Sequence, residues 1–190
     1  MSSIKLTADS GGGTFEIKAP SSGSNARVLT IPDSASGTVL TTTNAKAGNI
    51  IQVVHVDQQT AVESTSTSSY VSTGLSTSIT LTDSSNKILV MISQNFRLAS
   101  ASGGGQNGGA FQILRGSTNL TPNQQAYLFY NSNGQSASLF NYLNYAHQVL
   151  DTPGSGTHTY STKMITYGTG TSIYANYAGN SRMTLLEVAV

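Results

Sequence analysis

Short β-prone runs recur along this sequence, separated by clusters of glycine, serine, asparagine and proline. The most apolar run, Lys87–Ile92, is rich in β-branched residues and is only six residues long. Runs of this length between turn residues are typical of strands, because buried helices usually need at least about ten to twelve residues. We therefore expect an all-β protein with Lys87–Ile92 as its central core strand.

Other runs refine this expectation. Asn49–Val56 is apolar on both alternating faces, which predicts a strand buried between two layers. Met183–Val190 is expected to pair inside a sheet, because a free apolar edge promotes aggregation. Residues 138–150 are β-prone, with a short helix over Phe140–Leu150 as the alternative. About eight to ten strands at short spacing predict an antiparallel β-sandwich, jelly-roll-like, with a short N-terminal β-arm.

The chain is unusually poor in charge. Charged residues make up 9% of it and the formal net charge is +1, whereas about 25% is usual. Nucleic-acid and anionic-membrane partners are not expected, because both need clustered Lys and Arg, and the nine here are scattered. Disorder is disfavoured, because 37% of the residues are apolar. There is no cysteine, which excludes disulfides and thiolate chemistry. Neither a signal peptide nor a membrane-spanning run is expected.

Residues 1–45 contain several short β-prone runs but few large apolar side chains. Ordering a residue costs about 1–2 kcal/mol of backbone entropy, and burying a large apolar side chain returns about 1.5–3 kcal/mol. We therefore expect residues 1–45 to form a β-arm for attachment or oligomerisation, and residues 46–190 to form a β-sandwich knob. The alternative is that the arm packs on its own knob. Assembly contacts of the arm are expected at Leu29, Ile31, Val39 and Leu40.

The segment between these regions resembles a known element. Leu29-Thr-Ile-Pro-Asp33 followed by Gly37-Thr-Val-Leu-Thr-Thr-Thr-Asn44 is similar to the LTLP and GT(V/M)L(T)TTN element of tail-fibre-like and other virion structural proteins of tailed bacteriophages. The run Lys46–Gln52 is similar to the start of the β-rich C-terminal domain in such proteins. The resemblance covers about a quarter of the chain, and it implies an N-terminal arm that attaches or intertwines.

Tyrosine is concentrated late in the chain. Eight of the nine tyrosines follow residue 126. Tyrosine offers a flat apolar ring with a hydroxyl at its rim, which suits sugar rings and partly wet interfaces. Core packing and subunit interfaces are the favoured roles of these tyrosines, and contact of an exposed subset with a receptor or glycan is the alternative. The candidates for surface, receptor or interface contact are Tyr127, Tyr130, Tyr142, Tyr145, Tyr174 and Tyr177.

No metal or cofactor site is predicted. The three histidines, His55, His147 and His158, lie in separate runs without the paired spacing of metal ligands. In a homo-oligomer, His55 is a candidate to share an ion with its copies near a symmetry axis. The glycine-rich stretch from Ser100 to Gly109 lacks the ending of a phosphate loop and is interpreted as a surface loop before a strand at Ala110.

No catalytic residue is predicted either. Asp57 with Glu63 would be the pair of carboxylates in a polysaccharide-degrading enzyme. Glu187 is expected to face outward or to meet Arg182 or Arg115. Three other carboxylates are expected to hydrogen-bond their own backbone in turns: Asp33, Asp83 and Asp151.

Together with the resemblance, these features imply a non-enzymatic, tail-fibre-like virion protein made in a bacterial host cytoplasm. The expected partners are further copies in a homotrimer, other virion proteins and a host-surface glycan or protein. A capsid decoration or cement protein on the phage head is the first alternative. A polysaccharide-degrading enzyme is the second.

Overall fold

The computed structural model describes residues 3–7, 14–18, 45–100, 107–121, 126–131 and 138–190, with only the backbone for 3–7, 14–18 and most of 126–131. The chain divides into two compact units, residues 1–39 and 40–190. In the first, β1 (Ser3–Thr7) and β2 (Thr14–Lys18) pair in antiparallel fashion. The contacts expected at Leu29, Ile31, Val39 and Leu40 lie outside the described residues, and the boundary after residue 45 stays a prediction.

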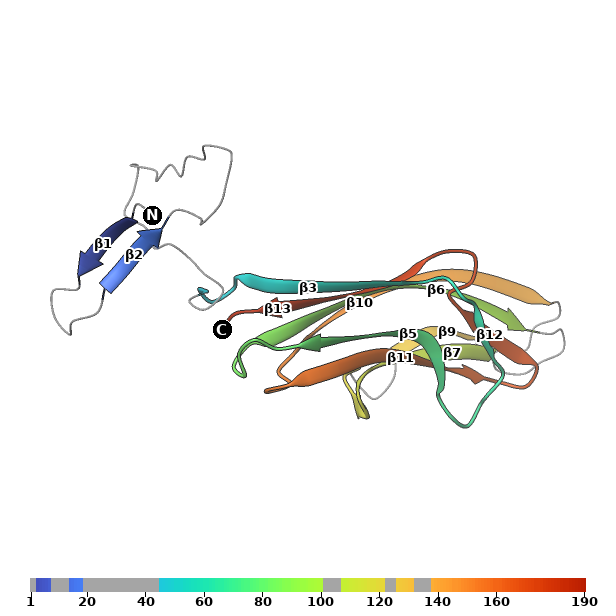
Figure 1. Cartoon of the computed structure of the whole chain (residues 1–190). Coiled ribbons are helices and arrows are strands. Elements are labelled where there is room, and N and C mark those ends of the chain that lie inside the picture. Colours follow the sequence, from blue (N-terminus) through green and yellow to red (C-terminus); the bar gives the residue numbers. More distant parts are fainter. Residues whose placement is uncertain (1–2, 8–13, 19–44, 101–106, 122–125, 132–137) are drawn as a thin grey trace. The chain divides into compact units, whose positions relative to one another are not determined.

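The second unit contains two antiparallel sheets, which Figure 1 shows as stacked layers. Sheet I consists of β3 (Ile50–Gln58), β4 (Val62–Ser64), β6 (Lys87–Ser100), β10 (Leu139–Asp151), β12 (Thr171–Ala175) and β13 (Ser181–Val188). Sheet II consists of β5 (Val71–Thr80), β7 (Asn107–Arg115), β8 (Thr118–Asn119), β9 (Ala126–Asn131) and β11 (Thr157–Tyr167). The predicted antiparallel β-sandwich is confirmed. Within the described residues, no helix is long and apolar enough to cross a membrane.

The strand order is that of a jelly roll. β10 lies along one side of β6, so β12 and β13 share the other side, as one interrupted strand. β4 and β3 pair with β12 and β13 and form a second interrupted strand. Counted in this way, with β8 set aside, the eight described strands of the sandwich follow the order 1-8-3-6 in sheet I and 2-7-4-5 in sheet II. This order makes successive strands alternate between the sheets, except at one hairpin, as in jelly rolls.

The core lies between the sheets and follows the two-residue period of each strand. On β6, every second residue from Ile88 to Leu98 is buried. From sheet II, Phe111, Tyr160 and Met164 meet this row, each fully shielded from water. The prediction of a central strand at Lys87–Ile92 is confirmed, and the strand continues to Ser100.

Two local expectations were wrong, and one alternative is excluded. β3 is an edge strand that pairs with β13 alone among the described strands, and Ile50 and Val53 on it are exposed. These two apolar side chains therefore lie on the outer face without being covered by a second layer. Residues 139–151 form strand β10, which confirms the β-prone run predicted over residues 138–150 and excludes the alternative of a helix. β7 begins at Asn107, so the end of the glycine-rich stretch belongs to a strand; Gly109 lies against Ile173 and Leu98 in the core, and an added Cβ would require these side chains to shift.

Glu187 is buried, contrary to the expectation that it faces outward or meets Arg182 or Arg115. It accepts hydrogen bonds from the backbone N–H and hydroxyl of Thr82 at 2.9 and 2.8 Å, from Asn86 Nδ2 at 2.6 Å and from Gln52 Nε2 at 2.6 Å. Burial raises the pKa of Glu187, but these donors outweigh it and hold the pKa below its usual value. The carboxylate is thus stabilised by neutral donors.

A second buried carboxylate, Asp151, lies at the same end of the sandwich as Glu187, because both residues pair in register with Ile88. Nη1 of Arg115 lies 2.7 Å from both carboxylate oxygens of Asp151, and the Tyr160 hydroxyl donates to one of them at 2.7 Å. Asp151 is the last residue of β10 and is buried, so its expected place in a turn was wrong. Asp83 does accept from its own turn, from the Ser85 N–H at 2.8 Å.

Candidate functional site

Four aromatic residues surround Arg97 on the outer face of sheet I, and we call Phe140, Tyr142, Tyr174 and Tyr177 with Arg97 the aromatic cluster. The register of the strands brings three members of the cluster together. Arg97 on β6 lies opposite Tyr142 on β10 and opposite Tyr174 on β12. Tyr174 in turn lies opposite Glu63 on β4. One row of side chains therefore crosses four strands.

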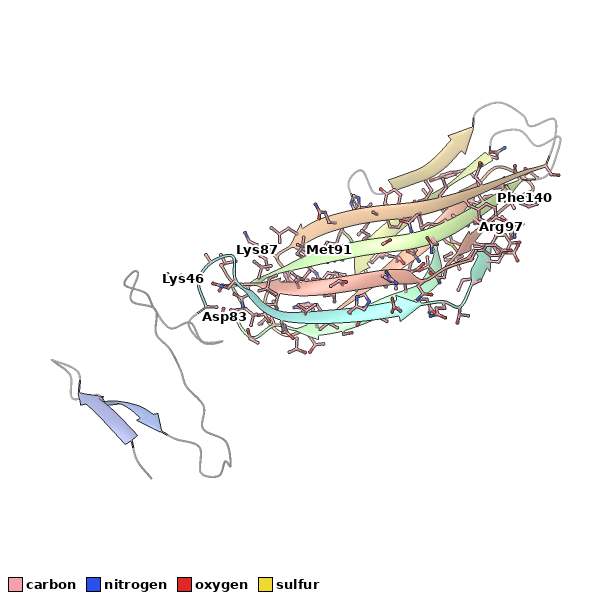
Figure 2. The ribbon with its side chains drawn as sticks, turned by 90° about the horizontal axis from the view of Figure 1, so that it is seen from above. Lys46, Asp83, Lys87, Met91, Arg97 and Phe140 are labelled. Carbon is pink, nitrogen blue, oxygen red and sulfur yellow. The ribbon has the colours of Figure 1, made fainter. Side chains whose placement is uncertain are left out.

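The cluster faces solvent. The residues next to it in sequence, Leu98 and Ile173, point into the core with 3% and 0% exposure. Side chains alternate along a strand, so Arg97 and Tyr174 point outward. Phe140 is 55% and Tyr142 is 62% exposed. Figure 2 shows Arg97 and Phe140 close together at one end of sheet I, with Met91 and Lys87 toward the other end.

The rings hold the guanidinium group of Arg97. Its central carbon lies 4.5 Å from the ring centroid of Phe140, 5.0 Å from that of Tyr174 and 4.7 Å from that of Tyr177. Tyr177 also contacts Tyr174 and Tyr142, at centroid distances of 5.5 and 6.1 Å. Cation–π contacts of this kind contribute about 0.5–2 kcal/mol each, depending on desolvation.

Arg97 has no carboxylate partner among the described residues. The two other described arginines do: Arg115 pairs with Asp151 and Arg182 with Asp57. Nε of Arg97 is buried under the rings and has no described acceptor. Glu63, in the same row, instead accepts a hydrogen bond from the Tyr174 hydroxyl at 2.6 Å. This hydrogen bond to Glu63 raises the pKa of Tyr174, followed by smaller effects of burial and of the Glu63 charge.

Tyr177 is presented by a fixed backbone excursion between β12 and β13. Asn176, at the start of the excursion, has a positive φ of 58° and is buried. Its amide donates to the carbonyls of Thr73 and Thr60 at 2.7 and 3.0 Å and accepts from Gln94 Nε2 at 3.0 Å. These hydrogen bonds link both sheets, so the position of Tyr177 is tied to the core.

The other candidate tyrosines lie elsewhere. Tyr145 is half-buried, and its ring contacts that of Phe111 in the core at 4.4 Å. Tyr127 and Tyr130 belong to β9, and their side chains are outside the described part. Sequence analysis did not single out Arg97 or Phe140. Alternation along Lys87–Ser100 and Leu139–Asp151 places both on the outward set, but only the register of β6 and β10 brings them together.

The opposite end of the same outer face carries an apolar patch. Val53, Leu186, Leu89 and Leu150 form one row across β3, β13, β6 and β10. Val53 and Leu150 are each 57% exposed. Along β6 the row lies eight residues from Arg97, or about 26 Å at about 3.3 Å per residue. The outer face thus has two distinct regions, which we call the apolar row and the aromatic cluster.

A shallow groove lies between these regions, lined by His55, Met91, Ser93, Ala146, Arg182 and Thr184 among others. Nδ1 of His55 lies 2.8 Å from the Thr184 hydroxyl, and its Nε2 lies 3.4 Å from Asp57. No group of three or more metal-ligating side chains occurs within the described parts of the chain. His55 and Asp57 are therefore placed on the surface without further ligands beside them.

The two carboxylates proposed for a degrading enzyme are each engaged. Asp57 accepts from Arg182 Nε at 3.1 Å, and Glu63 accepts from Tyr174. They belong to different strands, β3 and β4.

No protein-family model matches the chain, and no curated protein sequence matches it. Similar solved structures include that of the Gx strain of infectious bursal disease virus, with 12% identity and a TM-score of 0.34 over 98% of this chain and 47% of that one. The VP2 subviral particle of the same virus has 12% identity and a TM-score of 0.32, over 73% of this chain and 38% of that one. The chain spans less than half the length of these proteins, and similarity of this degree assigns no family.

Proposed function

We propose that the chain is a non-enzymatic structural protein of a tailed-phage virion, similar to tail-fibre proteins, which assembles as a homotrimer and adheres to the host surface. The virion assignment rests on the resemblance of residues 29–44 to the tail-fibre element. The adhesive role rests on one observation, the outer face of sheet I. Among the described residues, this outer face carries every exposed large apolar side chain except Val190.

The apolar row is the surface we assign to contact between copies of the chain. Contiguous exposed apolar side chains mark interaction sites, because leaving them in water costs free energy. A symmetric trimer buries the same row on each copy. The aromatic cluster lies at the far end of the face and remains available to a receptor.

Light scattering at micromolar concentration tests the assembly. A trimer is the expected result, and a stable folded monomer would contradict the proposal. A truncated chain that begins at Lys46 should stay soluble and folded while losing incorporation into particles. If the truncation unfolds the sandwich, residues 1–45 are part of its core and the boundary is wrong.

The main alternative is a capsid decoration or cement protein, which also needs a sandwich and a docking segment. Labelling the protein in purified particles distinguishes the two. We expect the label on the tail, whereas label on the head would favour the decoration role.

An enzyme acting on surface polysaccharide is the less favoured function, because Asp57 and Glu63 are each hydrogen-bonded to another side chain. Incubation with host capsule or lipopolysaccharide should produce no shortening of the polymer. Cleavage that is lost on Asp57→Asn or Glu63→Gln substitution would instead support the enzyme.

A further inference from the structure

The aromatic cluster combines two features that a receptor site for saccharides needs. Exposed rings, here Phe140 and Tyr142, give flat apolar surfaces on which the C–H face of a sugar ring packs. Tyr142 also carries a hydroxyl at its rim, which hydrogen-bonds to polar groups of a ligand. The row of Tyr142, Arg97 and Tyr174 crosses three adjacent strands, or about 10 Å at about 4.8 Å per strand. A short stretch of polysaccharide fits such a surface better than a single ion does.

Arg97 adds charge selectivity. It is the one described arginine without a carboxylate partner, in a chain with a net charge of only +1. Guanidinium groups bind carboxylates through a fork of two parallel N–H donors. The rings of Phe140, Tyr174 and Tyr177 fix the orientation of this fork in advance, so less side-chain entropy is lost on binding. Glu63 lies two strands away from Arg97 in the same row and accepts its hydrogen bond from Tyr174, and the described residues show no ion pair between Glu63 and Arg97.

The support beneath the cluster is rigid. The hydrogen bonds of Asn176 to Thr73, Thr60 and Gln94 hold the excursion that carries Tyr177. Gly179, in the same excursion, lies against the side chain of Asn95, whose amide would have to shift to admit a Cβ at this position. A surface that is ordered before the ligand arrives binds more tightly than one that must be ordered on binding.

We propose that the aromatic cluster binds a carboxylated saccharide, with the carboxylate on the guanidinium group of Arg97 and the sugar ring against Tyr142 and Phe140. This assignment rests on the proposed adhesive function and names the class of its receptor: acidic surface polysaccharide. The unpaired Arg97 favours an acidic sugar over a neutral one. The rings favour a saccharide over inorganic anions.

The test uses the full chain and a panel of oligosaccharides containing galacturonic, glucuronic or sialic acid, each compared with its own methyl ester. The ester keeps the ring and removes the charge. We expect calorimetry at low salt to give at least one acidic member an affinity about tenfold or more above its ester. Equal affinity for acid and ester, no binding of any member at millimolar concentration, or equally strong competition by inorganic phosphate would overturn the proposal.

Variants locate the site. Arg97→Gln should abolish the preference for acid over ester, and Tyr142→Ser should weaken both forms alike. The matched control is Arg182→Gln, which removes an arginine of the same outer face that is already paired with Asp57; its affinities should stay within about twofold. Equal losses in the Arg97 and Arg182 variants would contradict the assignment. Thermal unfolding of each variant identifies misfolding, and Arg97→Lys, which keeps the charge without the planar fork, should recover only part of the preference.

Mass spectrometry of purified particles separates this inference from the function on which it rests. If the protein is a particle component but ignores acidic sugars, the ligand assignment fails and the virion role stands. If it binds acidic sugars but is absent from particles, the virion role fails and the binding site stands.

Discussion

The outer faces of the two sheets differ sharply in chemistry. That of sheet I carries the apolar row and the aromatic cluster, with Val53, Leu150 and Tyr142 all more than half exposed. The outer face of sheet II over β5 and β11 instead carries exposed serine and threonine side chains, whose hydroxyl groups form hydrogen bonds with one another across the two strands. Ser78 and Thr159 are joined at 2.7 Å, and Thr80 and Thr157 at 2.7 Å.

Both faces belong to the same sandwich, so folding alone does not require this difference. A sandwich needs apolar side chains only on the inward positions of each strand, because the outward ones remain in water. Hydroxyl pairs on sheet II satisfy each other and leave little to offer a partner. The apolar and aromatic outward positions of sheet I are therefore where a partner is expected.

The largest predicted effect is on assembly. Charging the apolar row by Val53→Asp with Leu150→Asp should weaken self-association about 100-fold or more, because buried unpaired carboxylates would face one another in the interface. Sedimentation over a range of concentrations measures this. The control is Ser78→Asp with Thr157→Asp, which adds the same two charges to sheet II and should leave the oligomer unchanged. If both double variants weakened self-association equally, the difference proposed between the two outer faces would be wrong.

The next largest effect is on stability, and it compares a buried glutamate of sheet I with an exposed one on its outer face. Glu187→Gln should reduce the free energy of unfolding by about 2–3 kcal/mol, because one carboxylate oxygen becomes a donor that faces Thr82, Asn86 or Gln52. Glu63→Gln on the outer face is the matched change and should cost less than about 0.5 kcal/mol. Urea unfolding at pH 7 measures both. A small loss for Glu187→Gln would mean that its hydrogen bonds add little to stability.

The same glutamate predicts how stability depends on pH. Its pKa is lowered in the folded state relative to the usual 4.5, so the unfolded chain takes up the proton first as the pH falls. The stabilisation by Glu187 is present above about pH 4.5 and is lost as the pH falls through the lowered value. The Glu187→Gln variant should therefore lose less stability between pH 5 and pH 3 than the parent. Parallel curves would contradict this role.

The smallest predicted effect concerns the hydroxyl pairs. Thr159→Val on sheet II removes the bond to Ser78 but leaves both positions exposed, and stability should change by less than about 0.5 kcal/mol. Oligomeric state and saccharide binding should not change. A loss of either would show that sheet II also takes part in recognition and would narrow the difference between the faces.

Several features could be predicted from sequence because they depend on neighbours along the chain. Alternation and turn residues predicted the strands at Lys87–Ile92 and Met183–Val190 and the sandwich class. The same pattern misplaced β3, because apolar residues on both faces of a run do not reveal whether a second layer covers the outer one. It also misplaced Glu187, because the donors that make its burial possible come from Gln52, Thr82 and Asn86, more than a hundred residues earlier.

The sequence by itself determined that the chain forms β-strands, that it carries little charge and that its tyrosines gather late in the chain. Local propensity and composition are enough for these properties. Only the tertiary structure decided that Tyr142, Tyr174 and Tyr177 meet around Arg97 while Tyr145 packs against Phe111. The physical reason is strand register: a shift of one residue between β6 and β10 would turn Tyr142 into the core and Tyr145 out to solvent.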